Sequence, residues 1–112
     1  MIVIGAIEER SNATSVENTD GTASDDDTNV DSGAVYVFKK DAAGDWSQDA
    51  YLKASNSGTS DYFGYSVAIS GNVIVAGAYR EDSNANSVEN MDSTASDDDT
   101  GNDNGAAYIF KR

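Results

Sequence analysis

The sequence repeats itself with a period of 72 residues, and this repeat constrains the fold more than any other feature. Residues 2–39 superimpose on residues 74–111 without a gap, and 26 of the 38 aligned pairs are identical. The chain of 112 residues therefore holds about one and a half copies of one unit. Tandem units of this size fold by stacking similar supersecondary elements on one another, so we expect a repeat architecture.

One unit is predicted to contain four short strands and no helix. Two apolar, aromatic-rich runs are separated only by Gly71-Asn72, and both residues tolerate the positive φ angles of a tight hairpin turn. Other runs alternate between apolar and polar residues, and no segment has helical periodicity. The predicted strands cover residues 33–38, 45–54, 62–70, 73–79 and 105–110. A sixth strand begins at Met1, which aligns with Val73 in the repeat.

This order of strands is typical of an all-β fold made of antiparallel four-stranded blades of a β-propeller. Residues 1–54 would form one partial blade, with its second to fourth strands and a long acidic loop at 11–32. Residues 61–112 would form a second partial blade, with its first to third strands and a long loop at 83–104. A β-solenoid coiled around calcium is the alternative fold, although a 72-residue period fits it poorly.

The apolar residues of the strand at 73–78 occupy both of its faces, which suits a sheet packed between two neighbouring sheets. Phe63 is predicted to be an aromatic core residue, and Gly64 to allow close approach of another backbone. The aromatic residues that recur at strand spacing are also assigned to the core. These are Tyr36, Phe38, Tyr108 and Phe110.

Composition excludes several classes of function. The chain has 20 Asp and Glu against 7 Lys and Arg, a net charge of -13, which argues against binding to nucleic acid or anionic membranes. It has no Cys and no His, so cysteine nucleophiles, disulfides and imidazole bases are absent. No apolar run reaches the ~18 residues needed to insert across a membrane. We therefore expect a protein that is not an enzyme.

Twelve of the 20 acidic residues lie in the two long loops. Oxygen-bearing side chains at alternate positions can converge on a calcium ion, which takes six to eight oxygen ligands. The candidate ligands are Asp25, Asp27, Asp31, Asp97, Asp99 and Asp103. Such segments are equally typical of solvated loops that bind nothing, and the spacing does not match an EF-hand.

The order of three motifs resembles the FG-GAP repeat, the blade unit of integrin α-subunit-like propellers, and in particular its bacterial form. The motifs are Phe63-Gly64, Val75-Ala-Gly-Ala78 and Gly105-Ala-Ala-Tyr-Ile-Phe110. Integrin-type blades carry a calcium loop between their first and second strands, where this chain has only Ser70-Gly71-Asn72. The calcium ligands of that family therefore have no counterparts here.

The resemblance implies a secreted or cell-surface protein that functions in adhesion or ligand binding, with a protein or a carbohydrate as ligand. The partial blades predict a fragment that packs against further blades of the same protein or forms a homo-oligomer, and a fragment would also explain why no signal peptide is visible. Two alternatives stay open at this point. One is a structural spacer with solvated acidic loops, and the other is an accessory propeller of a larger extracellular hydrolase.

Overall fold

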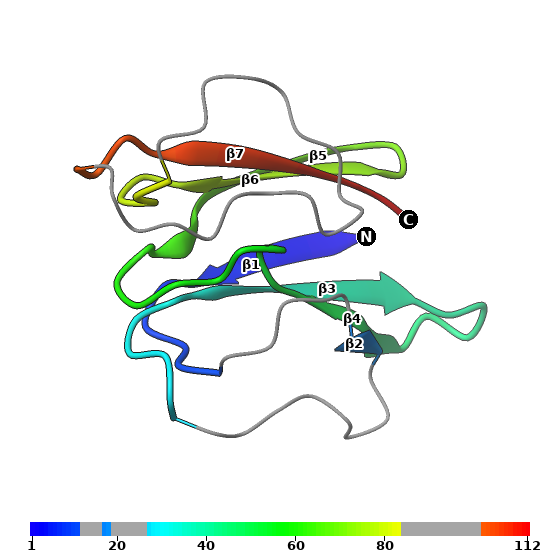
Figure 1. The fold of residues 1–112 in the computed structure, drawn as a ribbon. Coiled ribbons are helices and arrows are strands. Elements are labelled where there is room, and N and C mark those ends of the chain that lie inside the picture. The colour runs from blue at the N-terminus through cyan, green and yellow to red at the C-terminus, as the bar shows by residue number, and fades with distance from the viewer. Residues whose placement is uncertain (12–16, 19–26, 84–101) are drawn as a thin grey trace.

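The computed structural model describes residues 1–11, 17–18, 27–83 and 102–112, which form two stacked antiparallel sheets (Figure 1). Sheet A has the strand order β1-β3-β4-β2, and sheet B has the order β5-β6-β7. The strands of sheet A are β1 (Ile2–Ala6), β2 (Glu17–Asn18), β3 (Ala34–Lys40) and β4 (Trp46–Leu52). Those of sheet B are β5 (Phe63–Ser70), β6 (Val73–Ala78) and β7 (Ala106–Lys111). The predicted all-β class is confirmed, and the part of the chain that the structure describes contains no helix.

The predicted hairpin and turn residues occupy the expected positions. Ser70 pairs with Val73, so only Gly71 and Asn72 join β5 to β6, and Gly71 has a φ of 57°. Between β3 and β4, the Asp41 carboxylate accepts hydrogen bonds of 2.9 Å from the amides of Ala43 and Asp45. Both connections are short because their residues favour tight turns.

The range 11–32, predicted to be a long acidic loop, contains one short strand among its described residues. Within this range, β2 pairs antiparallel with the outer side of β4, with Glu17 opposite Tyr51 and Asn18 opposite Ala50. The outer edge of β4 otherwise presents unpaired backbone groups, which readily accept another strand. A two-residue strand has no pattern of its own that could predict it from sequence.

The core lies between the two sheets. Phe63 is fully buried at its centre, with its ring 5.2 Å from that of Tyr108 and 6.0 Å from that of Phe110 in edge-to-face contacts. Sheet A contributes Val35 and Val37, which are also fully buried. The core roles predicted for Phe63, Tyr108 and Phe110 are therefore confirmed, whereas Tyr36 and Phe38 are only half-buried.

Gly64 brings β5 against sheet A. It has a φ of 88°, and a Cβ built there would lie 2.6 Å from the carbonyl oxygen of Ala34. Gly5 of β1 faces the backbone of Gly64 so closely that a Cβ on Gly5 has no room. Beside this contact, Gly33 forms a parallel β-bridge with Phe63. The Phe-Gly pair is thus the contact point between the two sheets, as its sequence predicts.

The face of each sheet that points to the other sheet is buried, whereas much of the opposite face is exposed among the described residues. On β6, Ile74, Ala76 and Ala78 are buried against sheet A, whereas Val73 and Val75 on the opposite face are each 38% exposed. The expectation that both faces pack against sheets is therefore met on one side only. The outer faces of both sheets carry large apolar side chains that remain open to solvent.

Candidate functional site

Both long connections leave and return at the same end of the stacked sheets. The first follows Ala6, which pairs with Ala34, and the second follows Ala78, which pairs with Ala106. Strands β1 and β6 run in the same direction, so these four residues lie at one end of the molecule (Figure 1). This end, which we call the loop end, contains most of the polar contacts between side chains.

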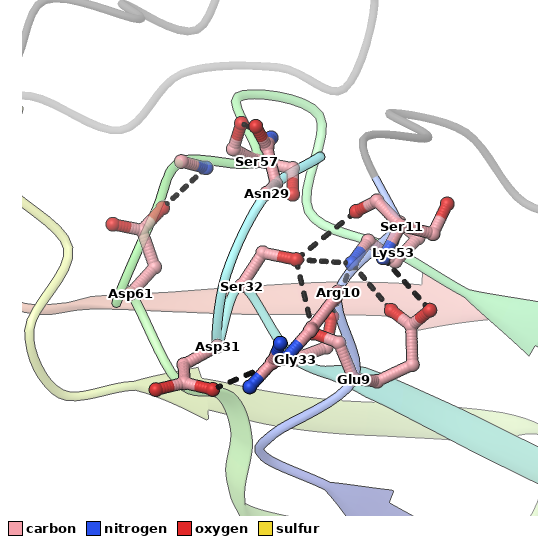
Figure 2. A network of polar contacts seen from close by, with 11 residues as sticks. Glu9, Arg10, Ser11, Asn29, Asp31, Ser32, Gly33, Lys53, Ser57 and Asp61 are labelled. Atoms are coloured by element: carbon pink, nitrogen blue, oxygen red, sulfur yellow. Dashed lines mark hydrogen bonds and ion pairs between the residues drawn. The ribbon is translucent and has the colours of Figure 1, made fainter. Parts of the chain in front are cut away.

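A buried lysine organises the loop end of sheet A. The side chain of Lys53 is completely buried, and its ammonium lies 2.8 Å from Glu9 Oε2 and 2.7 Å from Ser32 Oγ (Figure 2). The ammonium also donates to the carbonyl oxygen of Gly33 at 2.7 Å. Three donors on one ammonium meet three acceptors, which offsets the cost of burying its charge. Lys53 thereby ties the segment after β4 to both ends of the first long connection.

The carboxylate of Glu9 also holds the backbone. Its Oε1 accepts a 2.9 Å hydrogen bond from the amide of Ser11, and the hydroxyl of Ser32 donates to the carbonyl oxygen of Ser11 at 3.0 Å. Burial raises the pKa of the nearby Tyr51 phenol, and the negative charge of Glu9 raises it further. The phenol therefore stays neutral beside the ion pair.

The second copy repeats the carboxylate but gives it another side-chain partner. Glu81 is the repeat equivalent of Glu9 and is 6% exposed. Its Oε1 accepts a 3.0 Å hydrogen bond from the amide of Ser83. Here Asn56 Nδ2 donates to Glu81 Oε1 at 2.7 Å, and Tyr108 donates its hydroxyl proton to Asn56 Oδ1 at 2.6 Å. Burial raises the pKa of Tyr108, and the charges of Glu81 and Asp61 add to the shift.

Two of the predicted calcium ligands contact arginines. Asp31 and Asp103 are repeat equivalents with φ angles of 55° and 51°. Arg10 Nε lies 4.0 Å from Asp31 Oδ1, and Arg80 Nε lies 3.0 Å from Asp103 Oδ1. The two arginines are not repeat equivalents, so each copy places an arginine beside this aspartate from a different position.

The other predicted ligands are not brought together. Asp27 is exposed, and Asp25, Asp97 and Asp99 lie outside the described residues. Within the ranges that the structure describes, no three acidic side chains are grouped closely enough to hold a metal ion. The calcium hypothesis is therefore neither supported nor tested by these residues.

The sequence interpretation missed the roles of Lys53, Glu9 and Ser32. Lys53 sits at the end of an alternating strand, where a lysine is normally solvated, and nothing local marks it as buried. The one available signal is the repeat, because Glu9 recurs as Glu81 although its neighbours change. Conservation between the two copies thus indicates a structural carboxylate.

A shallow hollow marks the outer face of sheet B near the loop end. Two tyrosines flank it, Tyr65 and Tyr79, whose rings are tilted by 49° with their centroids 4.4 Å apart. The floor is formed by small residues, among them Gly77, Gly105 and Ala107. Among the described residues that line the hollow none is acidic or basic, and the polar ones are Ser66 and Asn104 beside the two tyrosines.

The stacked sheets and the 72-residue period define a tandem-repeat β-protein. Residues 46–90, which include β4, β5 and β6, match the family model of the FG-GAP repeat. This part of the chain is therefore similar to FG-GAP repeats, a class whose repeats form β-propeller-type domains, often in extracellular proteins. No curated protein and no solved structure matches the chain. No helix capable of crossing a membrane occurs among the described residues.

Proposed function

We propose that this chain is a non-enzymatic FG-GAP propeller segment of a secreted or cell-surface protein, which presents residues 11–32 and 83–104 for adhesion or ligand binding. The observation that carries the proposal is that both connections leave and return at the loop end, on a rigid base of stacked sheets (Figure 1). Long connections held by a rigid scaffold are common binding elements. The ligand would be a protein or a carbohydrate.

The chemistry of the described residues supports a role without catalysis. The half-buried carboxylate of Glu9 and the buried carboxylate of Glu81 accept hydrogen bonds from backbone amides and from the side chains of Lys53 and Asn56. They therefore hold the ends of the connections in place. Hydroxyl groups are plentiful, but no histidine exists in the sequence to activate one as a nucleophile.

Replacing one long connection tests whether these connections bind the ligand. We would screen the purified chain against a glycan array and a panel of extracellular matrix proteins, and repeat the screen with residues 84–101 replaced by a Gly-Ser linker. Specific binding that is lost in the variant, with an unchanged melting transition, supports ligand binding by the replaced residues. Binding that the variant retains in full would assign recognition to the sheets and contradict the proposal.

Calcium binding by the acidic loops is a further part of the proposal. Its support is the alternation of carboxylates in each loop, since adjacent negative charges repel one another until a cation binds. The described residues do not form a calcium site by themselves, and ligation by Asp31 or Asp103 would compete with Arg10 or Arg80.

A thermal melt followed by circular dichroism tests this calcium proposal. We expect millimolar calcium to raise the melting temperature relative to EDTA, because a ligand that prefers the folded state stabilises it. Magnesium at the same concentration should have little effect, and substitution of Asp25, Asp27, Asp97 and Asp99 by Asn should abolish the rise. A cooperative melt that is indifferent to calcium would favour the spacer alternative, with solvated loops.

A further inference from the structure

Three of the six tyrosines form a row on sheet B near the loop end. The ring of Tyr79 contacts the other two, with its centroid 5.5 Å from that of Tyr62 and 4.4 Å from that of Tyr65. The separation of 4.4 Å is smaller than in any other ring pair of the described residues. Tyr65 and Tyr79 are also 60% and 49% exposed, so solvent reaches this pair.

The backbone, and not only the side chains, holds Tyr65 and Tyr79 together. In the pairing of β5 with β6, Phe63 lies opposite Ala78 and Ser66 opposite Gly77, so the register skips Gly64 and Tyr65. An irregularity of this kind re-aims a side chain, and here Tyr65 lies on the outer face beside the residue that follows β6. The pair is therefore fixed by the same strand register that forms the hairpin.

The third tyrosine of the row is less open. Tyr62 is half-buried, and the guanidinium of Arg80 lies 5.7 Å from its ring centroid. Asp103 in turn lies 3.0 Å from Arg80. Tyr62 thus has a charged neighbour on its ring as well as Tyr79, and Tyr65 is the exposed end of the row.

We propose that Tyr65 and Tyr79 are an oxidative modification site, at which a one-electron oxidant joins the two rings in an intramolecular dityrosine crosslink. Each phenol gives one electron and its hydroxyl proton to the oxidant, which leaves two phenoxyl radicals. The radicals couple through one Cε atom of each ring, and the hydrogen atom on each of these carbons then moves to the phenol oxygen. The chain loses two hydrogen atoms, and a peroxidase passes the electrons to hydrogen peroxide, which is reduced to water.

The geometry favours coupling within one chain. A single bond between two aromatic rings leaves them twisted against each other with their centroids close together, so a pair already tilted by 49° at 4.4 Å needs little movement. Coupling between copies is disfavoured, because molecules with a net charge of -13 repel one another. The sequence also has no Cys, whose thiol would reduce a phenoxyl radical before it couples.

The crosslink would fasten the start of β5 to the end of β6 in a chain that has no cysteine for a disulfide. It would close a loop between residues 65 and 79, which restricts the unfolded state in the way that a disulfide does. The inference goes beyond the proposed function, because it does not depend on what the long connections bind.

Oxidation of the purified chain by a haem peroxidase and hydrogen peroxide tests the proposal. We expect a monomer that has lost two hydrogen atoms and shows the fluorescence of dityrosine. Trypsin then releases residues 54–80 as one peptide, which contains all three tyrosines of the row. Tandem mass spectrometry should show backbone fragments from cleavage between residues 62 and 65 but none from cleavage between residues 65 and 79.

Conservative variants identify the rings. Tyr65→Phe and Tyr79→Phe keep the ring but remove the phenol, so each should abolish the crosslinked monomer. Tyr36→Phe is the matched control, since the ring of Tyr36 lies 5.3 Å from that of Tyr51, which is only 1% exposed, and it should leave the yield unchanged. Oxidation in concentrated urea should also abolish the selective crosslink, because the hairpin no longer holds the rings together.

Three results would overturn the proposal. These are a product that consists only of covalent dimers, a crosslink between Tyr62 and Tyr79 as the main species, and an unchanged yield in Tyr65→Phe. Because the oxidation requires no ligand of the long connections, its failure leaves their proposed binding function intact. Replacement of residues 84–101 in turn leaves this tyrosine pair in place.

Discussion

Lys53 shows how one residue can attach a long connection to a sheet. Its ammonium is completely buried and meets Glu9, Ser32 and Gly33 at 2.7–2.8 Å. A buried charge is stable only while its partners are present, and removing either partner leaves the other charge uncompensated. The strength of this contact therefore decides how firmly the first long connection is attached to sheet A.

We expect Lys53→Met to destabilise the protein by about 3 kcal/mol, because the Glu9 carboxylate loses its buried counter-charge. Urea denaturation measures the change in free energy of unfolding. Lys39→Met is the matched control, since Lys39 is 44% exposed where it pairs with Asp49, and it should cost less than ~1 kcal/mol. Equal costs for the two variants would contradict the structural role of Lys53.

Substitutions at Gly64 and Gly71 distinguish the cost of backbone strain from the cost of a steric clash. Both have positive φ, but a Cβ at Gly71 meets nothing within 4 Å, whereas one at Gly64 lies 2.6 Å from the Ala34 carbonyl. We expect Gly71→Ala to cost about 1–2 kcal/mol from the left-handed conformation alone. Gly64→Ala should cost clearly more, because the two sheets must separate to accept it. Denaturant titrations of both variants test this, and similar costs would argue against a tight contact at Gly64.

At the scale of elements, the two sheets are joined by an ion pair as well as by the core. The carboxylate of Asp49 on β4 lies 3.0 Å from the ammonium of Lys39 on the adjacent strand. It also lies 3.0 Å from the guanidinium of Arg112, which follows β7 of sheet B. Burial opposes ionisation of Asp49, but the hydrogen bonds and charges of Lys39 and Arg112 outweigh it and hold its pKa below the ordinary value.

This lowered pKa gives a pH-dependent contribution to stability. Because the folded state binds the Asp49 proton less readily than the unfolded state, the contribution is present above the ordinary pKa of 3.8 and is lost as the pH falls below it. We expect Asp49→Asn to be less stable than the natural chain at pH 7, and this difference to shrink at about pH 3. Urea titrations at both pH values measure it, and a difference that does not change with pH would refute the assignment.

At the scale of the whole molecule, equivalent positions of the two repeat units differ in burial. Ile2 and Ile74 are the same residue at the same repeat position, opposite Phe38 and Phe110 respectively. Ile74 is fully buried between the sheets, whereas Ile2 is 43% exposed on the outer face of sheet A. The packing of one sheet on the other, and not the sequence of the strand, therefore decides whether a side chain is buried in the core.

This difference predicts unequal costs for the same substitution. Ile74→Ala should destabilise the chain by about 2–5 kcal/mol, because it leaves a cavity in the core. Ile2→Ala removes a side chain that is partly in water already, so it should cost less than ~1 kcal/mol. Thermal or chemical unfolding of the two variants provides the comparison. A large cost at Ile2 would show that the outer face of sheet A is covered in solution.

Much of the fold could be predicted from the sequence because it depends on local patterns. The strand runs, the Gly71-Asn72 turn and the role of Phe63-Gly64 are each encoded in a few adjacent residues. The candidate site was less predictable. The contacts of buried Lys53 and the Arg10–Asp31 and Arg80–Asp103 contacts join residues 20 to 44 positions apart, and no local pattern marks them.

By itself the sequence determined that the protein is an all-β tandem repeat, since a 72-residue period and alternating strands allow few other folds. Only the tertiary structure decided which face of each strand is buried, where β2 pairs, and which charges meet at the loop end. The reason is physical: alternation assigns side chains to two faces, but burial depends on which sheet packs against each face. Two similar units therefore share one core, while equivalent side chains such as Ile2 and Ile74 differ in burial.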